Sequence, residues 1–397
     1  MSLYCWMKLH LRGLTSNNLE STLTVILILK PNTDQDSPRY ELLTRYLDSL
    51  VNITYQVRHI QGTGQRLTEI YLLGDTKSLS MEFMRSLPCV QRVVRVQEAY
   101  RVLGRHGQED FPHQFEYNGI TFNQTNLHVF AGLCAVDTPE HVELMMKALK
   151  ENGQACTRMG AYKPRTNPYS FQGHGKNCLP YVFELAGKYD IRIICMEVTH
   201  ESHILEIHEA LEATGHPTGV MLQIGTRNTQ NFELLKCAGR QDDYPVLIKR
   251  GFGITLNESL NAAEYLASEG NRRVIFALRG MKTNLGDPHR NFVDFSHVPV
   301  VHRLTRMPVC IDPSHSVGNR QQSPDGLLDV MHATAQGIIA GANMVLVDFH
   351  PKPAKALVDG PQALRPDELP LFLGDVQIAR DAYLKRVALV QSRQEAA

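Results

Sequence analysis

The 397-residue chain lacks the features that mark membrane and exported proteins. Its longest apolar runs, such as TVILILK near residue 25, are far too short to span a bilayer. The N-terminal segment MSLYCWMKLHLRG lacks both the apolar stretch and the small-residue cleavage site of a signal peptide. The sequence therefore predicts a cytoplasmic protein that does not enter a membrane.

The chain also lacks an excess of charge and closely spaced cysteines. Lysine plus arginine number 41 and aspartate plus glutamate number 41, so no overall field attracts nucleic acid or an anionic membrane. The eight cysteines include no C-x-x-C pair, which favours reduced thiols over a disulfide framework or a structural zinc site. Any basic binding site must therefore be local.

Residues 21–103 show the pattern of a small α+β domain. Their apolar segments read strand, helix, strand, strand, helix, strand, and this order is typical of a ferredoxin-like unit. Catalytic residue types do not gather there, so we expect a structural or regulatory role. We predict that this domain covers residues 1–104 and that a linker and a hairpin cover 105–126, with Asn118 and Gly119 as the hairpin turn.

Residues 127–397 contain eight short apolar runs, most of them separated by amphipathic helical stretches. The runs are LHVFAGLC, ACTRMGA, IRIICMEV, GVMLQIGTR, PVLIKRG, RVIFALRG, PVCIDPSH and MVLVDFHP. Runs that are apolar on both faces indicate parallel strands covered by helices. Eight such units predict a (β/α)8 TIM barrel. A doubly wound open sheet is the alternative, but no G-x-G-x-x-G opens a helix after the first strand.

The carboxyl ends of the predicted strands carry many charged residues, and barrel enzymes build their sites there. The acidic residues and histidines at these ends are Glu197, Asp312, His315, Asp348 and His350. The cations are Arg158, Lys163, Arg165, Arg227, Lys249, Arg250 and Arg279. Each cation alone could be a solvated surface charge. Together they predict a funnel for a small anionic substrate that carries phosphate and carboxylate groups.

A second set of strand-end and loop residues has the chemistry of metal ligands. It consists of Cys134, His315, Asp348 and Asp359. One thiolate, one imidazole and two carboxylates suit Mn²⁺, Fe²⁺, Co²⁺ or Zn²⁺. Because buried cysteine is also a common small apolar residue, and a core histidine can be held by hydrogen bonds alone, both structural interpretations stay open.

Six segments in order resemble the signature segments of a known enzyme family. They are KPRTNPYSFQG, QIGTRNTQNFELLK, PVLIKRG, AAEYLASEGN, CIDPSHSVG and HPKPAKALVDGPQAL. These segments resemble type I 3-deoxy-D-arabino-heptulosonate 7-phosphate (DAHP) synthase, in the branch that also includes some KDO8P synthases. The front domain resembles the regulatory extension of one subgroup. The resemblance implies that phosphoenolpyruvate (PEP) condenses with erythrose 4-phosphate and phosphate is released, the first step of the shikimate pathway toward aromatic amino acids.

The resemblance also implies roles for individual residues. Pro164 fixes a turn that places Arg165 and Thr166 on the phosphate of the aldose, and Lys163 gives a proton to the new alkoxide. His315 and Glu197 are candidates for handling the proton of the attacking water. The residues that match the PEP site are Arg158, Lys163, Arg227, Lys249 and Arg279.

The resemblance further implies a cofactor and partners. Cys134, His315 and Asp359 match three ligands of a divalent metal, most often Mn²⁺, and Asp348 falls where the family has a fourth ligand, a glutamate. The ion acts as a Lewis acid on the aldehyde. A homotetramer or dimer is implied, and an aromatic amino acid is the effector expected for the front domain.

The chain departs from the family pattern at five positions. The segments GPC, RGGA, ERG and LSD become GLC, RMGA, LRG and LVD, although part of the family also has leucine in the third segment. The changed residues are Leu133, Met159, Leu278 and Val358, together with Asp348 for glutamate. Aspartate reaches roughly 1.3 Å less far, whereas metal–ligand distances vary by only about 0.2 Å. We expect three of the changes to crowd the metal and PEP positions.

These departures keep other functions open. One is a paralogue that condenses PEP, or a related keto acid, with another aldehyde, as in secondary metabolism. A second is a catalytically silent regulatory partner, which predicts decay of the cations, but all five PEP-type cations are present. A third is a metal-independent KDO8P synthase, but those enzymes have asparagine where Cys134 stands.

Overall fold

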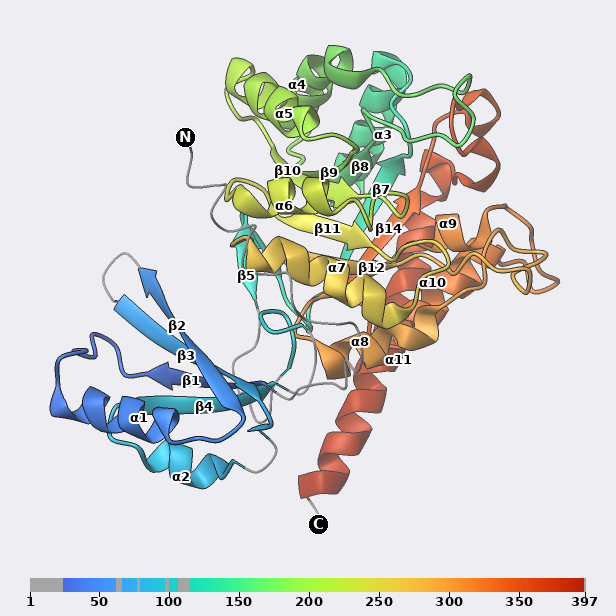
Figure 1. The fold of residues 1–397 in the computed structure, drawn as a ribbon. Helices are drawn as coiled ribbons and strands as arrows, with labels where there is room; N and C mark the ends of the chain where they lie inside the picture. The colour runs from blue at the N-terminus through green and yellow to red at the C-terminus, as the bar shows by residue number, and fades with distance from the viewer. Residues whose placement is uncertain (1–23, 62–65, 77–78, 97–99, 106–113, 396–397) are drawn as a thin grey trace. The chain divides into compact units, whose positions relative to one another are not determined.

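The chain consists of two compact units (Figure 1). The computed structural model describes residues 24–61, 66–76, 79–96, 100–105 and 114–395. The first unit comprises Met1–Ala99 with His106–Glu109, and the second comprises Tyr100–Arg105 with Asp110–Ala397. The N-terminal segment MSLYCWMKLHLRG and most of the expected linker lie outside the described residues.

The first unit has the predicted ferredoxin-like order. Its elements are β1 (Thr24–Leu29), α1 (Pro38–Asp48), β2 (Ile53–Gln61), β3 (Arg66–Gly74), α2 (Met81–Ser86) and β4 (Val90–Val96). The strands form an antiparallel sheet in the order β2-β3-β1-β4. Alternate residues of β1, such as Val25 and Leu27, pack with Leu43 of α1 and Met84 of α2, whereas Ile26 belongs to a separate cluster on the other face.

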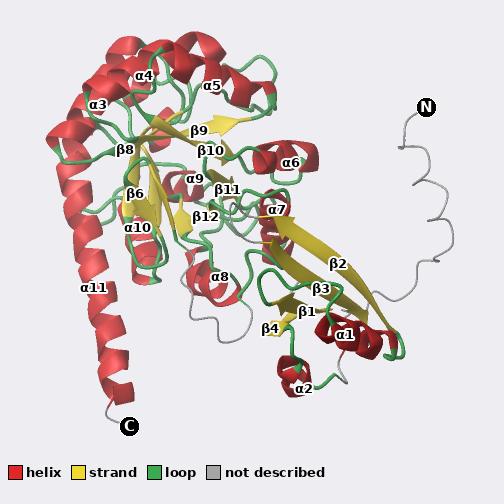
Figure 2. Cartoon of the chain, turned by 90° about the vertical axis from the view of Figure 1, so that its left-hand side faces the viewer, coloured by secondary structure: helices red, strands yellow, loops and turns green. Residues whose placement is uncertain are grey.

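The second unit is a closed barrel of eight parallel strands with helices around it (Figures 1 and 2), which confirms the predicted TIM barrel. Its strands are β7 (His128–Leu133), β8 (Cys156–Met159), β9 (Ile193–Val198), β10 (Gly219–Ile224), β11 (Val246–Lys249), β12 (Val274–Leu278), β13 (Val309–Ile311) and β14 (Met344–Asp348). Its helices are α3 (Pro139–Glu151), α4 (Leu179–Lys188), α5 (Ser202–Ala213), α6 (Phe232–Arg240), α7 (Leu256–Ser268), α8 (Val298–Leu304), α9 (Pro313–Val317), α10 (Asp329–Ile339) and α11 (Leu369–Glu395). Within the described part of the chain, no helix combines the length and the apolar character that crossing a bilayer requires.

The two-residue period of the strands decides which side chains enter the barrel. One alternating set, which includes Cys195, Leu247 and Ala277, forms an apolar cluster inside the barrel. The other set packs between the strands and the helices. The residue two positions after the last apolar interior side chain of a strand also points inward, and it lies at the carboxyl end of the barrel. Lys249, which follows Leu247, and Arg279, which follows Ala277, are examples.

A β-hairpin fills the amino-terminal end of the barrel. Its strands are β5 (Phe115–Tyr117) and β6 (Ile120–Phe122), and Asn118 and Gly119 between them have φ values of 45° and 75°, as the predicted turn requires. Phe115 stacks on Phe122 with 5.1 Å between ring centroids, and both rings belong to the interior cluster. The hairpin therefore closes the end opposite to the strand-end charges.

The division between the units differs from the expected boundary at residue 104. The backbone N–H groups of Val102 and Leu103 donate to the Glu264 carboxylate of α7 at 2.6 and 3.1 Å. The side chains of Tyr100 and Leu103 are buried in the core around the barrel. Because these contacts fix residues 100–105 to the barrel, the boundary lies at residue 99.

Candidate active site

Six charged side chains form a buried ring at the carboxyl end of the barrel. They are Arg158, Glu197, Lys249, Arg279, Asp312 and Asp348, and each is at most 7% exposed. Arg158 pairs with Asp348 at 2.5 Å, and Lys249 pairs with Asp312 at 2.6 Å. Glu197 accepts from Lys163, a residue of the loop after β8, at 3.0 Å. Each of the three carboxylates of the ring is thus paired with a cation.

Arg279 is the cation of this ring that forms no ion pair with a carboxylate of the described residues. It is 1% exposed, and its Nε and Nη1 atoms have no hydrogen-bond partner in the described part of the protein. Burial lowers the pKa of Arg279 to about 10, so the guanidinium is still charged at neutral pH. A buried, unpaired cation is costly. Arg279 lines a cavity, where an anion could compensate its charge.

The cavity above the ring has a volume of about 290 Å³ and a strongly cationic wall. Two carboxylates, Glu197 and Asp359, also face it. The lysines and arginines of the wall are Lys163, Arg165, Arg227, Lys249, Arg279 and Arg290. Most of the cations that the sequence placed at strand ends therefore meet in one cavity.

The loop after β8 supplies both the floor and the rim of the cavity. Lys163 is buried, and its Nζ donates to Glu197 and, at 3.3 Å, to the Cys134 sulfur. Pro164, Arg165 and Thr166 also line the cavity but are more exposed. Arg227 donates to the Thr166 hydroxyl at 3.1 Å, which joins this loop to the loop after β10.

Two of the predicted cations do not line the cavity. Arg158 lies below it, where Nη2 donates to the Cys134 sulfur at 3.5 Å. Arg250 donates to Asp294 at 3.1 Å, because the residue after Lys249 points out of the barrel. His350 is likewise turned away, and its Nε2 lies 2.8 Å from Asp137.

The electrostatic environment keeps the Lys163–Glu197 pair charged. Burial opposes the charge of Lys163, but Cys134 and Glu197 outweigh it and raise the pKa of Lys163. Burial likewise opposes the charge of Glu197, but Lys163 and Lys249 lower the pKa of this carboxyl group. A Cβ at Gly225 would lie 1.8 Å from Glu197 Oε1, so only glycine leaves room for the carboxylate there.

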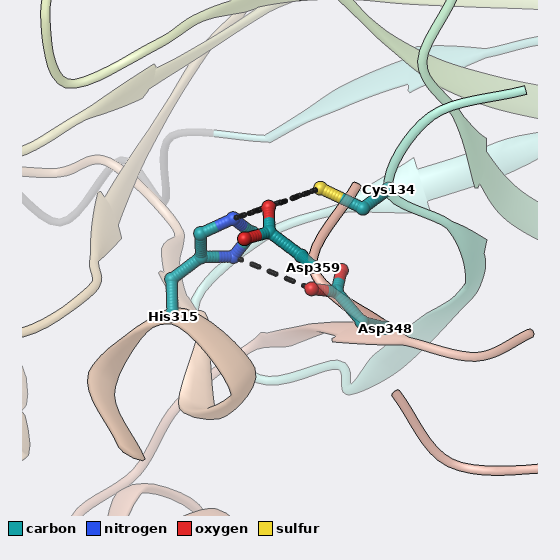
Figure 3. Close-up of side chains that lie close together, drawn as sticks. All are labelled: Cys134, His315, Asp348 and Asp359. Atoms are coloured by element: carbon teal, nitrogen blue, oxygen red, sulfur yellow. Dashed lines mark hydrogen bonds and ion pairs between the residues drawn. The ribbon is translucent and has the colours of Figure 1, made fainter. Parts of the chain in front are cut away.

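The four predicted metal ligands lie together (Figure 3). Cys134 Sγ lies 3.7 Å from His315 Nε2 and 3.0 Å from Asp359 Oδ2, and the nitrogen and this oxygen lie 3.4 Å apart. Metal–sulfur distances of about 2.3 Å and metal–nitrogen or metal–oxygen distances of about 2.1 Å place tetrahedral ligands about 3.3–3.6 Å apart. The three atoms therefore fit one divalent ion of the kind that binds both sulfur and nitrogen.

Asp348 stands apart from this triangle. It approaches the other imidazole nitrogen, with Oδ2 3.7 Å from His315 Nδ1 (Figure 3). Its two oxygens contact Arg158 and Gln362, each at 2.5 Å. The shorter aspartate thus serves as the counter-ion of Arg158 and as an acceptor for Gln362.

The structure corrects the expectation that the other departures crowd the site. Leu133, Met159 and Leu278 are fully buried in the layer between the strands and the helices. They follow or precede inward-facing residues, so the strand period turns them away from the cavity. Val358 packs against Cys134, and Asp348 lies beside His315, so these two changed residues contact side chains of the predicted metal ligands.

Three contributors to the site were not assigned a role from the sequence. Asp312 holds Lys249 and accepts from both the backbone N–H and Nδ1 of His315. Its inward strand position, shared with Lys249, was a usable signal. Arg290 donates to Asp359 at 3.0 Å and to Gln362 at 3.1 Å. Arg290 comes from an irregular loop and Gln362 from the three-residue 3-10 helix Gly360–Gln362, and no periodic pattern points to either residue.

Known proteins resemble this chain over most of its length. The model of the DAHP synthetase I family matches residues 110–382. The phospho-2-dehydro-3-deoxyheptonate aldolase of Thermotoga maritima is 34% identical over 343 residues, which cover 86% of this chain and 93% of that protein. A 2-dehydro-3-deoxyphosphooctonate aldolase of Acidithiobacillus ferrooxidans is 24% identical over 250 residues, 59% of this chain and 83% of that protein.

Two solved structures of the Thermotoga maritima enzyme are also similar. The crystal structure of its phospho-2-dehydro-3-deoxyheptonate aldolase (DAHP synthase) has a TM-score of 0.65 at 32% identity and covers 91% of this chain and 98% of that one. A truncated form of its 3-deoxy-D-arabino-heptulosonate 7-phosphate synthase has a TM-score of 0.61 at 31% identity and covers 71% of this chain and 97% of that one. The fold, the cationic cavity and these matches lead to one conclusion: this chain belongs to the DAHP synthetase I family.

Proposed function

We propose that the protein is a DAHP synthase, which joins PEP to erythrose 4-phosphate and releases inorganic phosphate. The observation that carries this proposal is the unpaired Arg279 in a cavity with six cationic and two carboxylate side chains. A cavity of this charge suits two phosphorylated substrates. Lys249 and Arg279 would hold the phosphate and carboxylate of PEP, and Arg165 and Thr166 the phosphate of the aldose.

The cavity also offers the proton transfers that this condensation needs. A bond forms between the methylene carbon of PEP and the aldehyde carbon, and Lys163 protonates the aldehyde oxygen. Water adds to the former enol carbon and gives a proton to Glu197, which leaves a hemiketal phosphate. Cleavage of the bond between this carbon and the phosphate oxygen, with transfer of the hydroxyl proton to the phosphate, releases inorganic phosphate and leaves the ketone. Because Lys163 and Glu197 are 3.0 Å apart, the proton can return to Lys163 and restore the starting state.

DAHP synthases are metal-dependent, and the residues present here fit a metal. We assign Cys134, His315 and Asp359 as the residues that would hold it, with Mn²⁺ as the expected ion. The bound ion would supply Lewis-acid polarisation of the aldehyde oxygen. Asp312 orients His315 through Nδ1, as a carboxylate commonly does for a metal-binding histidine.

The finer features of the proposal are a homotetramer or dimer, a cytoplasmic location and an aromatic amino acid as effector of the front domain. Its alternative is a paralogue that condenses PEP, or a related keto acid, with a different aldehyde. The contact of Asp348 with Arg158 favours this alternative, because Arg158, one of the PEP-type cations, then lies below the cavity wall.

One assay separates these functions. The purified protein with Mn²⁺ and PEP is mixed with erythrose 4-phosphate or with each of a panel of other aldehydes, and PEP loss and phosphate release are measured. We expect fastest turnover with erythrose 4-phosphate. Faster turnover with another aldehyde would establish the paralogue, and no turnover with any aldehyde would refute both enzymatic functions.

A further inference from the structure

Three cationic side chains surround a single aromatic ring at the mouth of the barrel. Phe252 lies in the loop after β11 and is half-buried. Its ring centroid lies 4.8 Å from the guanidinium carbon of Arg279, 5.3 Å from that of Arg227 and 5.7 Å from Nζ of Lys282. The cations come from the loops after β10 and β12, so the ring lies between the two neighbouring loops.

These cations have little else to hold them together. Arg279 lacks a carboxylate partner among the described residues, and the side chain of Arg227 donates to the Thr166 hydroxyl. Their charges repel each other, and the nearby Arg227 contributes to the lowered pKa of Arg279, after burial and the charge of Arg290. The negative face of an aromatic ring attracts cations at these distances. Phe252 is therefore the group that can draw Arg227 and Arg279 together without neutralising them.

The loop that carries Phe252 is fixed to the loop that carries Arg227. The Thr226 hydroxyl donates to the Arg250 carbonyl at 2.6 Å, and the Thr229 hydroxyl donates to the Lys249 carbonyl at 2.7 Å. A Cβ at Gly251 would lie 2.6 Å from Ile254 Cδ1, so the turn before the ring is closely packed. These contacts fix the backbone next to Phe252 to the loop from which the side chain of Arg227 extends.

We propose that Phe252 is a positioning residue for anion binding. Its ring gathers Arg227 and Arg279 at the wall of the cavity before the anion arrives, so that the ligand does not have to bring the two cations together. A carboxylate in the same place would also hold them, but it would compete with the phosphate. That the anion is PEP rests on the proposed function, whereas the role of the ring does not.

The test replaces Phe252 by leucine, which keeps apolar bulk and removes the ring. We expect Phe252→Leu to weaken the binding of PEP and of inorganic phosphate about 5- to 30-fold, because one or two cation–π contacts are lost. Calorimetry measures both affinities. KM for PEP should rise by a similar factor while kcat changes less than about threefold. Phe252→Tyr and Phe252→Trp should restore affinity, and Phe232→Leu on α6 is the control for loss of an exposed phenylalanine.

A second measurement does not depend on the ligand. In a double-mutant cycle of Phe252→Leu with Arg227→Met, we expect the effects on the unfolding equilibrium constant to be non-additive by about 3- to 10-fold. Additive effects, or equal phosphate affinity of wild type and Phe252→Leu, would overturn the inference. Wild-type protein that binds phosphate but not PEP would refute the proposed function alone, and wild type that binds neither would refute both.

Discussion

At the scale of single residues, Arg279 shows a conflict between stability and binding. Its guanidinium is buried without a carboxylate partner in the described structure, so it costs folding free energy that bound substrate would recover. Methionine has a similar shape and no charge. A neutral side chain should therefore suit the free protein better and the complex worse.

We predict that Arg279→Met weakens PEP binding about 100-fold or more and leaves the free energy of unfolding unchanged or raises it by about 1–3 kcal/mol. Calorimetry and urea denaturation without substrate measure the two effects. Arg303→Met, on the exposed side of α8, is the matched control. A variant that is less stable and binds PEP normally would contradict the assigned role.

Asp348 carries the second prediction at this scale. Its contacts with Arg158 and Gln362 place it outside the triangle of Cys134, His315 and Asp359. We predict that Cys134→Ser and Asp359→Asn weaken Co²⁺ binding about 100-fold or more, whereas Asp348→Asn weakens it less than about tenfold.

The thiolate-to-cobalt absorption band reports whether Cys134 binds the ion, and it can be measured without catalysis. It should persist in Asp348→Asn and vanish in Cys134→Ser. Because the amide leaves Arg158 unpaired, Asp348→Glu serves as a second variant that keeps the charge. Loss of cobalt from Asp348→Asn equal to that from Asp359→Asn would show that Asp348 is a full ligand.

At the scale of secondary-structure elements, strand register explains which parts of the site were predictable. A strand that places Leu247 inside the barrel must place Lys249 at its mouth, so a periodic pattern was enough to find the ring. The same rule would have excluded Arg250 and assigned Asp312. Arg290 and Phe252 lie on irregular loops and Gln362 ends a three-residue 3-10 helix, so only tertiary packing sets their positions. The eight strands and the ferredoxin-like order were predictable for the same periodic reason.

Helix α8 provides a prediction about pH. His302 is half-buried and lies 2.8 Å from the Asn343 amide oxygen, to which Nε2 donates. Burial, with a smaller effect of Arg105, lowers the pKa of His302 in the folded protein. Below the ordinary histidine pKa the unfolded chain therefore binds a proton that the native protein does not, and stability falls as pH falls.

We predict that His302→Gln, which keeps a donor for Asn343, reduces this loss of stability between about pH 7 and pH 5 by up to about 1.4 kcal/mol per pH unit. Urea unfolding at several pH values measures the slope. Parallel curves for wild type and variant would show that the histidine titrates normally in the folded state.

At the scale of the whole molecule, the boundary at residue 99 distinguishes two truncations. Residues 100–105 are fixed to the barrel by Glu264 and by the buried side chains of Tyr100 and Leu103. The barrel of this chain should therefore fold alone if these residues are kept.

We predict that the protein without residues 1–99 folds and keeps catalysis, and that removal of residues 1–105 lowers its stability by a further 3–6 kcal/mol, about the burial of two large side chains. Thermal and urea unfolding of both forms measure the difference. If the front domain senses an aromatic amino acid, inhibition by phenylalanine or tyrosine should disappear in the shorter forms. Unfolding of the form that begins at residue 100 would show that the front domain is structural.

The hairpin of β5 and β6 has a consequence for the order of events during turnover. With the amino-terminal end of the barrel plugged, traffic into the cavity runs through the loops at the other end. A metabolite seated on Lys249 and Arg279 lies at the bottom of a blind passage, below Arg165 and Thr166. The first metabolite to enter is then the last to leave. In isotope-partition experiments, a high concentration of erythrose 4-phosphate should therefore keep bound, labelled PEP from dissociating, so that the label appears in the product.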